Sequence, residues 1–313
     1  MRPAYSVVFL TTLIGAGQGL FLALYAAEAA AVLGLTGDIP DSRYFVRGAG
    51  LAVALAALGL FASFFHLGRP ERAWRSAAKW RTSWLSREVI ALPLFMALAA
   101  AWGAAHHYGW GTTLAIGALA LAACLALFVC TAMIYACIKF LQEWASPYTL
   151  PNFFFMGCAS GVTLAAALSA AQAPALAPAH ALAAIVFTLA ALATRLASLA
   201  RNARIRPTSS LQTAIGTRNP RVRQISQGFT GNSFNTQEFF HGASDARMRA
   251  VKAAFLLLGF VVPLALLAGG IASRSPALLG AAFLVQFAGL ALERWFFLAD
   301  ANHPQNLYYQ NRS

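Results

Sequence analysis

The chain has 313 residues, of which 59% are hydrophobic and only 11% are charged, and its mean hydropathy is +0.62. A water-soluble domain normally carries about a quarter charged residues, so this composition excludes a soluble protein and indicates a polytopic, all-α membrane protein. The formal net charge of +13 would suggest a nucleic-acid partner in a soluble chain. In a membrane chain it indicates topology instead, because basic residues gather in cytoplasmic loops, and we expect no nucleic-acid partner.

Apolar runs of the length that crosses a bilayer, about 20 residues, recur along the whole chain. We expect eight transmembrane helices, at 6–33, 47–67, 88–107, 112–141, 152–172, 180–200, 252–273 and 277–299. They form a single integral membrane domain over 1–313. Glu followed closely by Trp ends the fourth and eighth spans, which suggests two four-helix bundles related by a parallel repeat. Interfacial anchoring explains that pattern equally well.

The first span contains the stretch GAGQG at residues 15–19. It overlaps a glycine-rich nucleotide-binding pattern, but no strand precedes it, so we interpret it as close helix packing through small residues. Gln18 and Glu28 are polar within the same span, which is a sign of possible function. For Glu28, a solvated position near the far boundary is at least as good an interpretation.

The polar chemistry concentrates between the second and third spans, in FASFFHLGRPERAWRSAAKWRTSWLSREVIALP at residues 61–93. Six basic residues alternate with three tryptophans there, a mixture that favours the water–lipid boundary. His66 ends one apolar run and Glu88 begins the next, so an imidazole and a carboxylate stand at the facing ends of consecutive spans. Both groups can titrate near neutral pH when desolvated. The pair is therefore suited to exchanging protons with a carrier dissolved in the bilayer.

The connection at 201–251 is far longer than two helices need. It is polar and basic, and its aromatic residues argue against simple disorder; these are Phe229, Phe234, Phe239 and Phe240. We expect it to be a docking surface for a cytoplasmic partner, on the same face as His66.

Basic residues divide unequally between the two faces of the eight-span arrangement. All but three of the 23 lysine and arginine residues fall on the face that carries both termini, the exceptions being Arg43, Arg47 and Arg274. Because basic residues favour the cytoplasmic side, we expect both termini, His66 and the long loop to be cytoplasmic.

We expect no haem or metal in this chain. The six histidines lie at span ends or in loops, whereas haem ligation in a bundle needs facing pairs. The four cysteines lie in or at the ends of apolar runs without a CxxC motif, so we interpret them as small core residues.

Besides proton exchange with a carrier in the bilayer, two other classes of function stay open. A transporter normally has broken helices and polar groups near the bilayer midplane, whereas the mid-span residues here are mainly Ala, Leu, Gly and Phe. A purely structural anchor is the other class, because a lone interfacial histidine more often holds structure than performs catalysis. If the carrier is a quinone, its reaction moves electrons together with protons. A redox partner would then be required, since this chain has no electron donor or acceptor of its own.

The residues FFHLGRPERAWR, KWRTSWLSREV, GFTGNSFNTQEFFHG and LERWFFLADANHPQNLYYQ resemble the membrane-anchor (C subunit) family of DMSO reductase over essentially the whole chain. The resemblance implies a bacterial inner-membrane enzyme of three subunits: a molybdopterin catalytic subunit, a ferredoxin-like iron–sulfur subunit and this quinone-reacting anchor. It also implies that His66 and Glu88 serve the site of an exchangeable ubiquinone or menaquinone. From their neighbourhood we add Arg69, Arg81 and Trp84 to the expected quinone-binding residues.

Within that family, the loop and the C-terminal motifs are most similar to members that serve quinone-linked sulfite oxidation. A typical DMSO reductase carries its catalytic subunits on the outer face, whereas the sulfite-oxidising type carries them in the cytoplasm. Because the basic residues place the His66 face in the cytoplasm, we expect quinone reduction coupled to sulfite oxidation. Quinol oxidation that feeds a DMSO-type or other sulfur or oxyanion reductase is the alternative.

Overall fold

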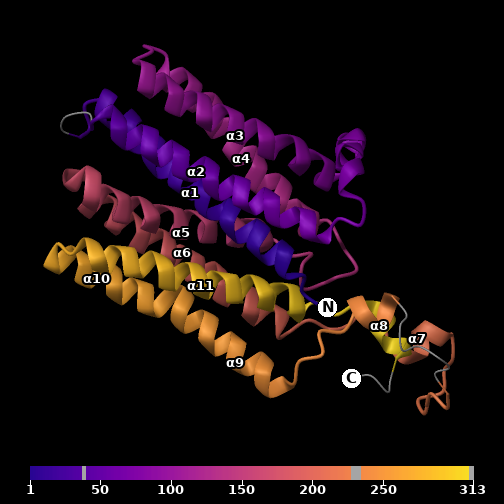
Figure 1. The fold of residues 1–313 in the computed structure, drawn as a ribbon. Helices are drawn as coiled ribbons and strands as arrows, with labels where there is room; N and C mark the ends of the chain where they lie inside the picture. Colours follow the sequence, from indigo (N-terminus) through magenta and orange to yellow (C-terminus); the bar gives the residue numbers. More distant parts are fainter. Residues whose placement is uncertain (37–39, 227–233, 310–313) are drawn as a thin grey trace.

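In the computed structural model, residues 1–36, 40–226 and 234–309 are described, and every regular element in these ranges is helical (Figure 1). Eight helical segments of the described chain are long and apolar enough to cross a membrane, which confirms the predicted number. They are α1 (Tyr5–Val32), α2 (Ser42–Ser63, extended by a 3-10 turn), α3 (Trp84–Tyr108), α4 (Thr113–Ala136), α5 (Thr149–Gln172), α6 (Ala177–Asn202), α9 (Asp245–Leu256) joined to α10 (Val262–Ser273), and α11 (Pro276–Asp300).

Several helix ends differ from the predicted boundaries for local reasons. Helix α2 begins before the predicted residue 47, because the side chain of Asp41 accepts a hydrogen bond from the backbone N–H of Arg43 and caps the helix. Ser244 caps α9 in the same way by accepting from Arg247, so the last part of the predicted loop is helical. A π-helical turn joins α9 to α10 just before Pro263, which has no N–H to donate to the helix.

Glycines bring α1 and α5 into backbone contact at the centre of the molecule. A Cβ atom on Gly19 would overlap the carbonyl oxygen of Gly157, and one on Gly161 would overlap the backbone nitrogen of Leu20. Gly17 faces α2 in the same way, since a Cβ atom on it would lie 2.7 Å from the carbonyl oxygen of Ala52. The interpretation of the first-span glycines as a packing surface is confirmed.

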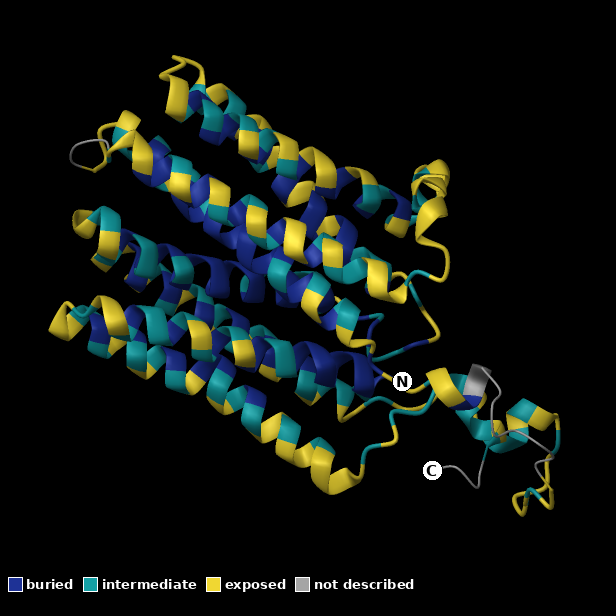
Figure 2. Ribbon diagram, in the orientation of Figure 1, coloured by how far each residue is buried: buried dark blue, intermediate teal, exposed yellow. Residues whose placement is uncertain are grey.

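Helices α1 and α5 are the central pair of the bundle. Helix α1 packs extensively on both α2 and α5, α3 packs on α4, and α5 also contacts α6 and α11. Buried residues line the sides of these helices that face one another, and exposed apolar residues lie on the outside (Figure 2). Because α1 contacts α5 as widely as it contacts α2, the division into two four-helix bundles stays a prediction.

The two ends of the bundle differ in what they carry. One end carries the N-terminus and the short helices α7 (Leu211–Ile215) and α8 (Phe234–Glu238) (Figure 1). We call it the α7–α8 end. The other end, where α1, α3, α5 and α10 finish, is called the far end.

Candidate functional site

The residues that join α2 to α3 cross the α7–α8 end of the bundle. A 3-10 turn at Phe64–His66 follows α2, and a longer 3-10 helix, Pro70–Lys79, begins with a proline whose fixed φ suits a first helical turn. No residue of Pro70–Lys79 is buried, and Trp74 is 71% exposed. The predicted basic and aromatic segment therefore lies on the outside of the bundle, where its tryptophans and cations suit a membrane boundary.

Stacking between arginine and tryptophan shapes this segment. The guanidinium of Arg81 lies 5.5 Å from the ring centroid of Trp80, and that of Arg87 lies 4.1 Å from Trp84. Arg87 also donates hydrogen bonds to the backbone carbonyls of Trp80 and Arg81, at 2.9 and 2.8 Å. Sequence reasoning had assigned Arg81 to the site and left out Arg87. The i, i+3 spacing of Trp84 and Arg87 was the signal that could have identified it. Arg69 is exposed just before the 3-10 helix.

His66 is exposed at the end of its 3-10 turn and reaches back to the first helix. Its Nδ1 lies 3.1 Å from the hydroxyl of Ser6, in the first turn of α1. The contact ties the end of α2 to the start of α1 and leaves the rest of the imidazole accessible.

Glu88 lies in the second turn of α3 and points into the bundle. Only 7% of its surface is exposed, and its Oε1 accepts a hydrogen bond of 2.5 Å from the hydroxyl of Thr131 on α4. Helix α3 begins as it does because Ser83 caps it, the Ser83 hydroxyl accepting from the N–H of Ser86. This cap fixes the start of α3, and with it the rotation of the helix that points the Glu88 side chain into the bundle.

The two sequence-predicted proton groups share an end of the bundle without touching. Within the described ranges, no hydrogen bond or ion pair joins His66 to Glu88. His66 lies outside against α1, and Glu88 lies inside against α4. A molecule that contacts both groups has to reach from the boundary surface into the bundle.

Behind Thr131 a small cavity of about 20 Å³ opens toward the second half of the chain. Its size fits one water molecule, and its polar lining supplies the partners that a buried water needs. The polar residues that line it include Thr11, Thr12, Thr131, Ser160 and Arg294. The polar surroundings of Glu88 thus continue beyond α4.

Three charged side chains of α6 and α11 that the sequence places at the cytoplasmic surface are buried inside the bundle. The Nε of Arg195 lies 2.8 Å from Oε1 of Glu293, and Nη2 of Arg294 lies 4.0 Å from Oε2 of the same carboxylate. Arg195 and Glu293 are each 1% exposed and Arg294 is 6% exposed. The cluster satisfies the general rule that a buried charge is paired. Its signal in the sequence was that each charge stands inside an apolar helical run.

A third buried carboxylate, Glu28, lies at the far end. Glu28 is 2% exposed; its Oε2 accepts a hydrogen bond of 2.8 Å from the indole of Trp102, and its Oε1 lies 3.2 Å from Nε2 of His106. The alternative of a solvated Glu28 is therefore wrong. Gln18, the other polar residue of α1, donates to the backbone carbonyl of Cys124 at 2.8 Å and joins α1 to α4.

The described part of the predicted docking loop is held against both terminal segments. The amino group of Met1 donates to the carbonyls of Ala299 and Ala301, and the N–H of Arg2 donates to the carbonyl of Glu238. Further contacts join the loop to the C-terminal segment: Phe239 stacks on His303 at 3.7 Å, Asn306 donates to the carbonyl of Phe239, and the Tyr308 hydroxyl donates to that of Ala214. Phe229 lies outside the described residues.

Burial lowers the pKa of several groups in this extramembrane assembly, among them the Met1 amino group and His303. It lowers the pKa of the Met1 amino group to about 6, although Glu143 and Asp300 oppose the shift. Burial also lowers the pKa of His303, and the nearby N-terminal charge adds to that effect.

His, Cys, Asp and Glu are the side chains that could hold a metal ion, and the cysteines among them differ in exposure. In the described parts of the chain, no cluster of three or more His, Cys, Asp or Glu side chains is arranged to hold a metal ion. Three of the cysteines are buried as expected, whereas Cys137 is exposed where the chain leaves α4.

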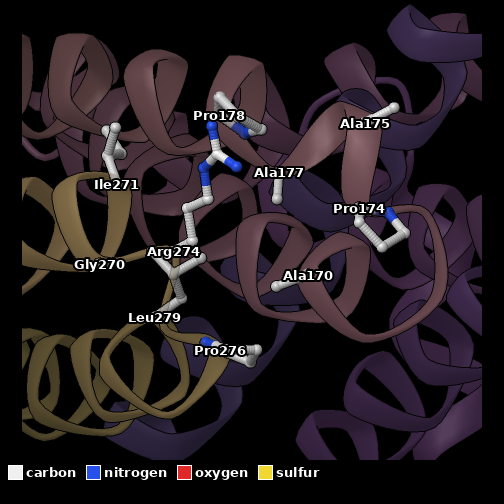
Figure 3. Close-up of a pocket in the computed structure, with 10 residues that line it drawn as sticks. All are labelled: Ala170, Pro174, Ala175, Ala177, Pro178, Gly270, Ile271, Arg274, Pro276 and Leu279. Carbon is white, nitrogen blue, oxygen red and sulfur yellow. The ribbon is translucent and has the colours of Figure 1, made fainter.

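A groove of about 480 Å³ lies at the far end, away from His66 and Glu88. It is formed by the α5–α6 and α10–α11 turns, and Arg274 extends across it toward Pro178 (Figure 3). Arg274 has a positive φ of 51°, a left-handed conformation that caps α10. None of the residues expected to bind quinone lines this groove.

A multi-pass helical membrane protein whose exposed polar chemistry gathers at one end is the class that this fold and site define. The chain matches the family model described as DMSO reductase anchor subunit (DmsC) over residues 1–309. It therefore belongs to the DMSO reductase anchor subunit family.

Two relatives show the breadth of this similarity. The chain is 52% identical over 324 residues to the C subunit of sulfite dehydrogenase from Allochromatium vinosum, an alignment that covers 99% of both chains. It is 34% identical over 131 residues to anaerobic dimethyl sulfoxide reductase chain YnfH of Escherichia coli K12, which covers 41% of this chain and 46% of the relative. The membership confirms the family resemblance seen in the sequence motifs.

Proposed function

We propose that this chain is the quinone-reacting anchor of a three-subunit molybdopterin and iron–sulfur oxidoreductase that oxidises sulfite in the cytoplasm. The observation that carries the proposal is the position of Glu88, buried in α3 with one hydroxyl partner, behind an exposed boundary segment that carries His66. The similarity to the C subunit of a sulfite dehydrogenase over nearly the whole chain supports the choice of sulfite.

The chemistry assigns the residues complementary tasks. Sulfite, water and quinone give sulfate and quinol, so two electrons and two protons must reach the quinone. The partner iron–sulfur subunit supplies the electrons, since this chain contributes only proton-exchanging and binding groups. His66 and Glu88 hold and deliver protons at the boundary and inside it. Arg69 and Arg81 offer donors to a carbonyl oxygen, and Trp84 packs beside them.

Docking of the iron–sulfur and molybdopterin subunits is assigned to the α7–α8 end. The loop there is basic, and its packing on both terminal segments gives a partner an ordered surface to contact. Even without the buried Arg195 and Arg294, this end carries most of the lysines and arginines, which favours a cytoplasmic orientation.

Turnover of the assembled complex tests the site. In inner membranes, Glu88→Gln and His66→Ala should each lower sulfite-dependent quinone reduction by about a hundredfold or more, the usual contribution of a proton-transfer group. His107→Ala is the matched control, because His107 is an exposed histidine at the far end. Wild-type kinetics in either site variant would remove that residue from the site.

Cys137 provides a test of orientation without any engineered cysteine. It is the exposed cysteine at the end of α4 on the α7–α8 side, whereas the other three are buried. A membrane-impermeant maleimide should label it in inside-out vesicles and leave it unlabelled in right-side-out spheroplasts, with Cys137→Ser as the blank. The opposite pattern would place the docking end outside the cell.

The second candidate function is quinol oxidation for a DMSO-type reductase, which the similarity to YnfH favours over part of the chain. The purified complex distinguishes the two. Sulfite should reduce quinone at a high rate, and quinol should not support the reduction of dimethyl sulfoxide.

A further inference from the structure

A lipid-facing groove lies between the two halves of the chain, beside the first turns of α1. It has a volume of about 530 Å³, and its walls come from α1, α9 and α11. Tyr5 and Phe9 form the α1 wall, and Val251 and Leu292 lie on α9 and α11. Tyr5 is 63% exposed and Phe9 is 46% exposed, so both rings line open space instead of packing in the core. All three walls are parts of membrane-spanning segments, so the groove opens to lipid.

The polar end of this groove carries a cation and an indole. Arg247 and Trp295 both line the groove, and the Arg247 guanidinium lies 5.8 Å from the Trp295 ring centroid. Arg247 stands in the first turn of α9, at the level where the chain enters the membrane. Arg249 and Lys252 follow on the same helix, and none of the three forms an ion pair within the described residues. The end of the groove is therefore positively charged and lacks an internal counter-ion.

The occupant has to match both parts of the groove. The long apolar walls suit a hydrocarbon chain, and the guanidinium suits a phosphate, to which arginine donates paired hydrogen bonds. A quinone has a hydrocarbon tail as well, and its carbonyl oxygens accept hydrogen bonds, but its ring carries no negative charge to balance the cationic end. An anionic phospholipid of the adjoining leaflet satisfies the apolar and the charged parts together.

We propose that this groove is a binding site for one anionic phospholipid, whose phosphate lies on Arg247 and whose acyl chain lies along α1 and α11. The lipid fills the gap between the first helix and the last two spans, which makes it part of the packing between the halves. The site is separate from the proposed quinone site, because none of the residues expected to bind quinone lines this groove. It does not depend on the function proposed above.

The lipid content of the purified protein tests the proposal. The full chain, with whatever subunits accompany it, is purified in mild detergent and its bound phospholipids are counted by native mass spectrometry. We expect about one anionic phospholipid per chain in the wild type, and about fivefold less in Arg247→Gln, the effect of one cation at a membrane surface. Arg249→Gln is the matched control, since it removes the same charge from the same helix but does not line the groove. Equal occupancy in the two variants would overturn the proposal.

A second variant fills the groove and leaves the charge in place. Ala288 is exposed on α11 and lines the groove, so Ala288→Trp should displace the lipid without overpacking the core. Adding phosphatidylglycerol to delipidated protein should restore occupancy in the wild type but not in this variant, and phosphatidylcholine with the same acyl chains should restore neither. Retention of the lipid in Ala288→Trp, or a neutral isoprenoid bound in place of the lipid, would show that the groove serves another purpose.

Discussion

Two buried carboxylates stand at opposite ends of the first four helices, and their surroundings differ. Glu28, at the far end, has the Trp102 indole and the His106 imidazole within 3.2 Å. His106 is itself stacked on Phe45, with a ring-centroid distance of 4.5 Å. Glu88, at the α7–α8 end, has one hydroxyl donor, Thr131, and a water-sized cavity behind it. Along α3, Glu88 and His106 are separated by about 27 Å of helix.

We expect the number of partners to separate a structural carboxylate, Glu28, from the carboxylate proposed to react, Glu88. A carboxylate enclosed by an indole and an imidazole is satisfied in one arrangement, and any proton movement there breaks packing. A carboxylate with one hydroxyl partner keeps capacity to bind a further proton or ligand. In the sequence, Glu28 and Glu88 are both acidic residues near span ends. Only the hydrogen-bonding partners seen in the structure distinguish the two.

The largest effect should come from removing the enclosed carboxylate. Glu28→Ala leaves the Trp102 and His106 nitrogens buried without an acceptor, which should cost about 3–5 kcal/mol of folding stability. Glu88→Ala is the matched control, since it removes a carboxyl of similar burial but leaves a single hydroxyl unpaired. Unfolding in detergent, followed by circular dichroism, measures both. Equal losses would mean that the two sites are alike.

A smaller effect should follow from removing the one donor to Glu88. Thr131→Val keeps the shape of the side chain and deletes the hydroxyl, so the carboxyl loses its fixed orientation. Quinone turnover should fall by about tenfold, the equivalent of one hydrogen bond of about 1.4 kcal/mol. Thr194→Val is the control, because the Thr194 hydroxyl donates only to carbonyls of its own helix. Unchanged turnover in Thr131→Val would indicate that Thr131 does not position Glu88.

The smallest effect concerns pH and the extramembrane assembly at the α7–α8 end. Burial holds the pKa of His303 below its ordinary value of 6.5, and its Nδ1 accepts from the N–H of Gln305. Because the folded pKa is lowered, this packing is most stable above about pH 6.5 and weakens as the pH falls toward the folded pKa. The rate of limited proteolysis of the loop should be several times higher at pH 5.5 than at pH 7.5. In His303→Phe the acceleration should be reduced; an unchanged response would assign it to other groups such as the Met1 amino group or His241.

Much of the fold followed from composition, because a bilayer demands long apolar helices and the described part of the chain has eight of them. His66 and Glu88 could be identified as candidates since their position at the ends of apolar runs is visible in the sequence. Their separate partners, Ser6 and Thr131, could not, because those pairs depend on how distant helices cross.

Charged residues show where sequence reasoning stops. Arg195 and Arg294 count as loop charges in a topology sum, yet the fold pairs them with Glu293 in the interior. A sequence reports that a charge stands near a span end but not which way the helix is rotated. The sequence left a buried and a solvated Glu28 both open for the same reason, since its partners come from another helix.

The glycine contact between α1 and α5 has a mechanical consequence. With backbone against backbone at Gly19, Gly157 and Gly161, the two helices have no side-chain layer through which to slide or rock. Rocking halves are how many carriers alternate their access across a membrane. Under the proposed function, a chain clamped at its midpoint would keep its redox partner and its quinone at a constant separation, so that diffusion of the quinone through the bilayer, and not opening of the bundle, would pace electron delivery.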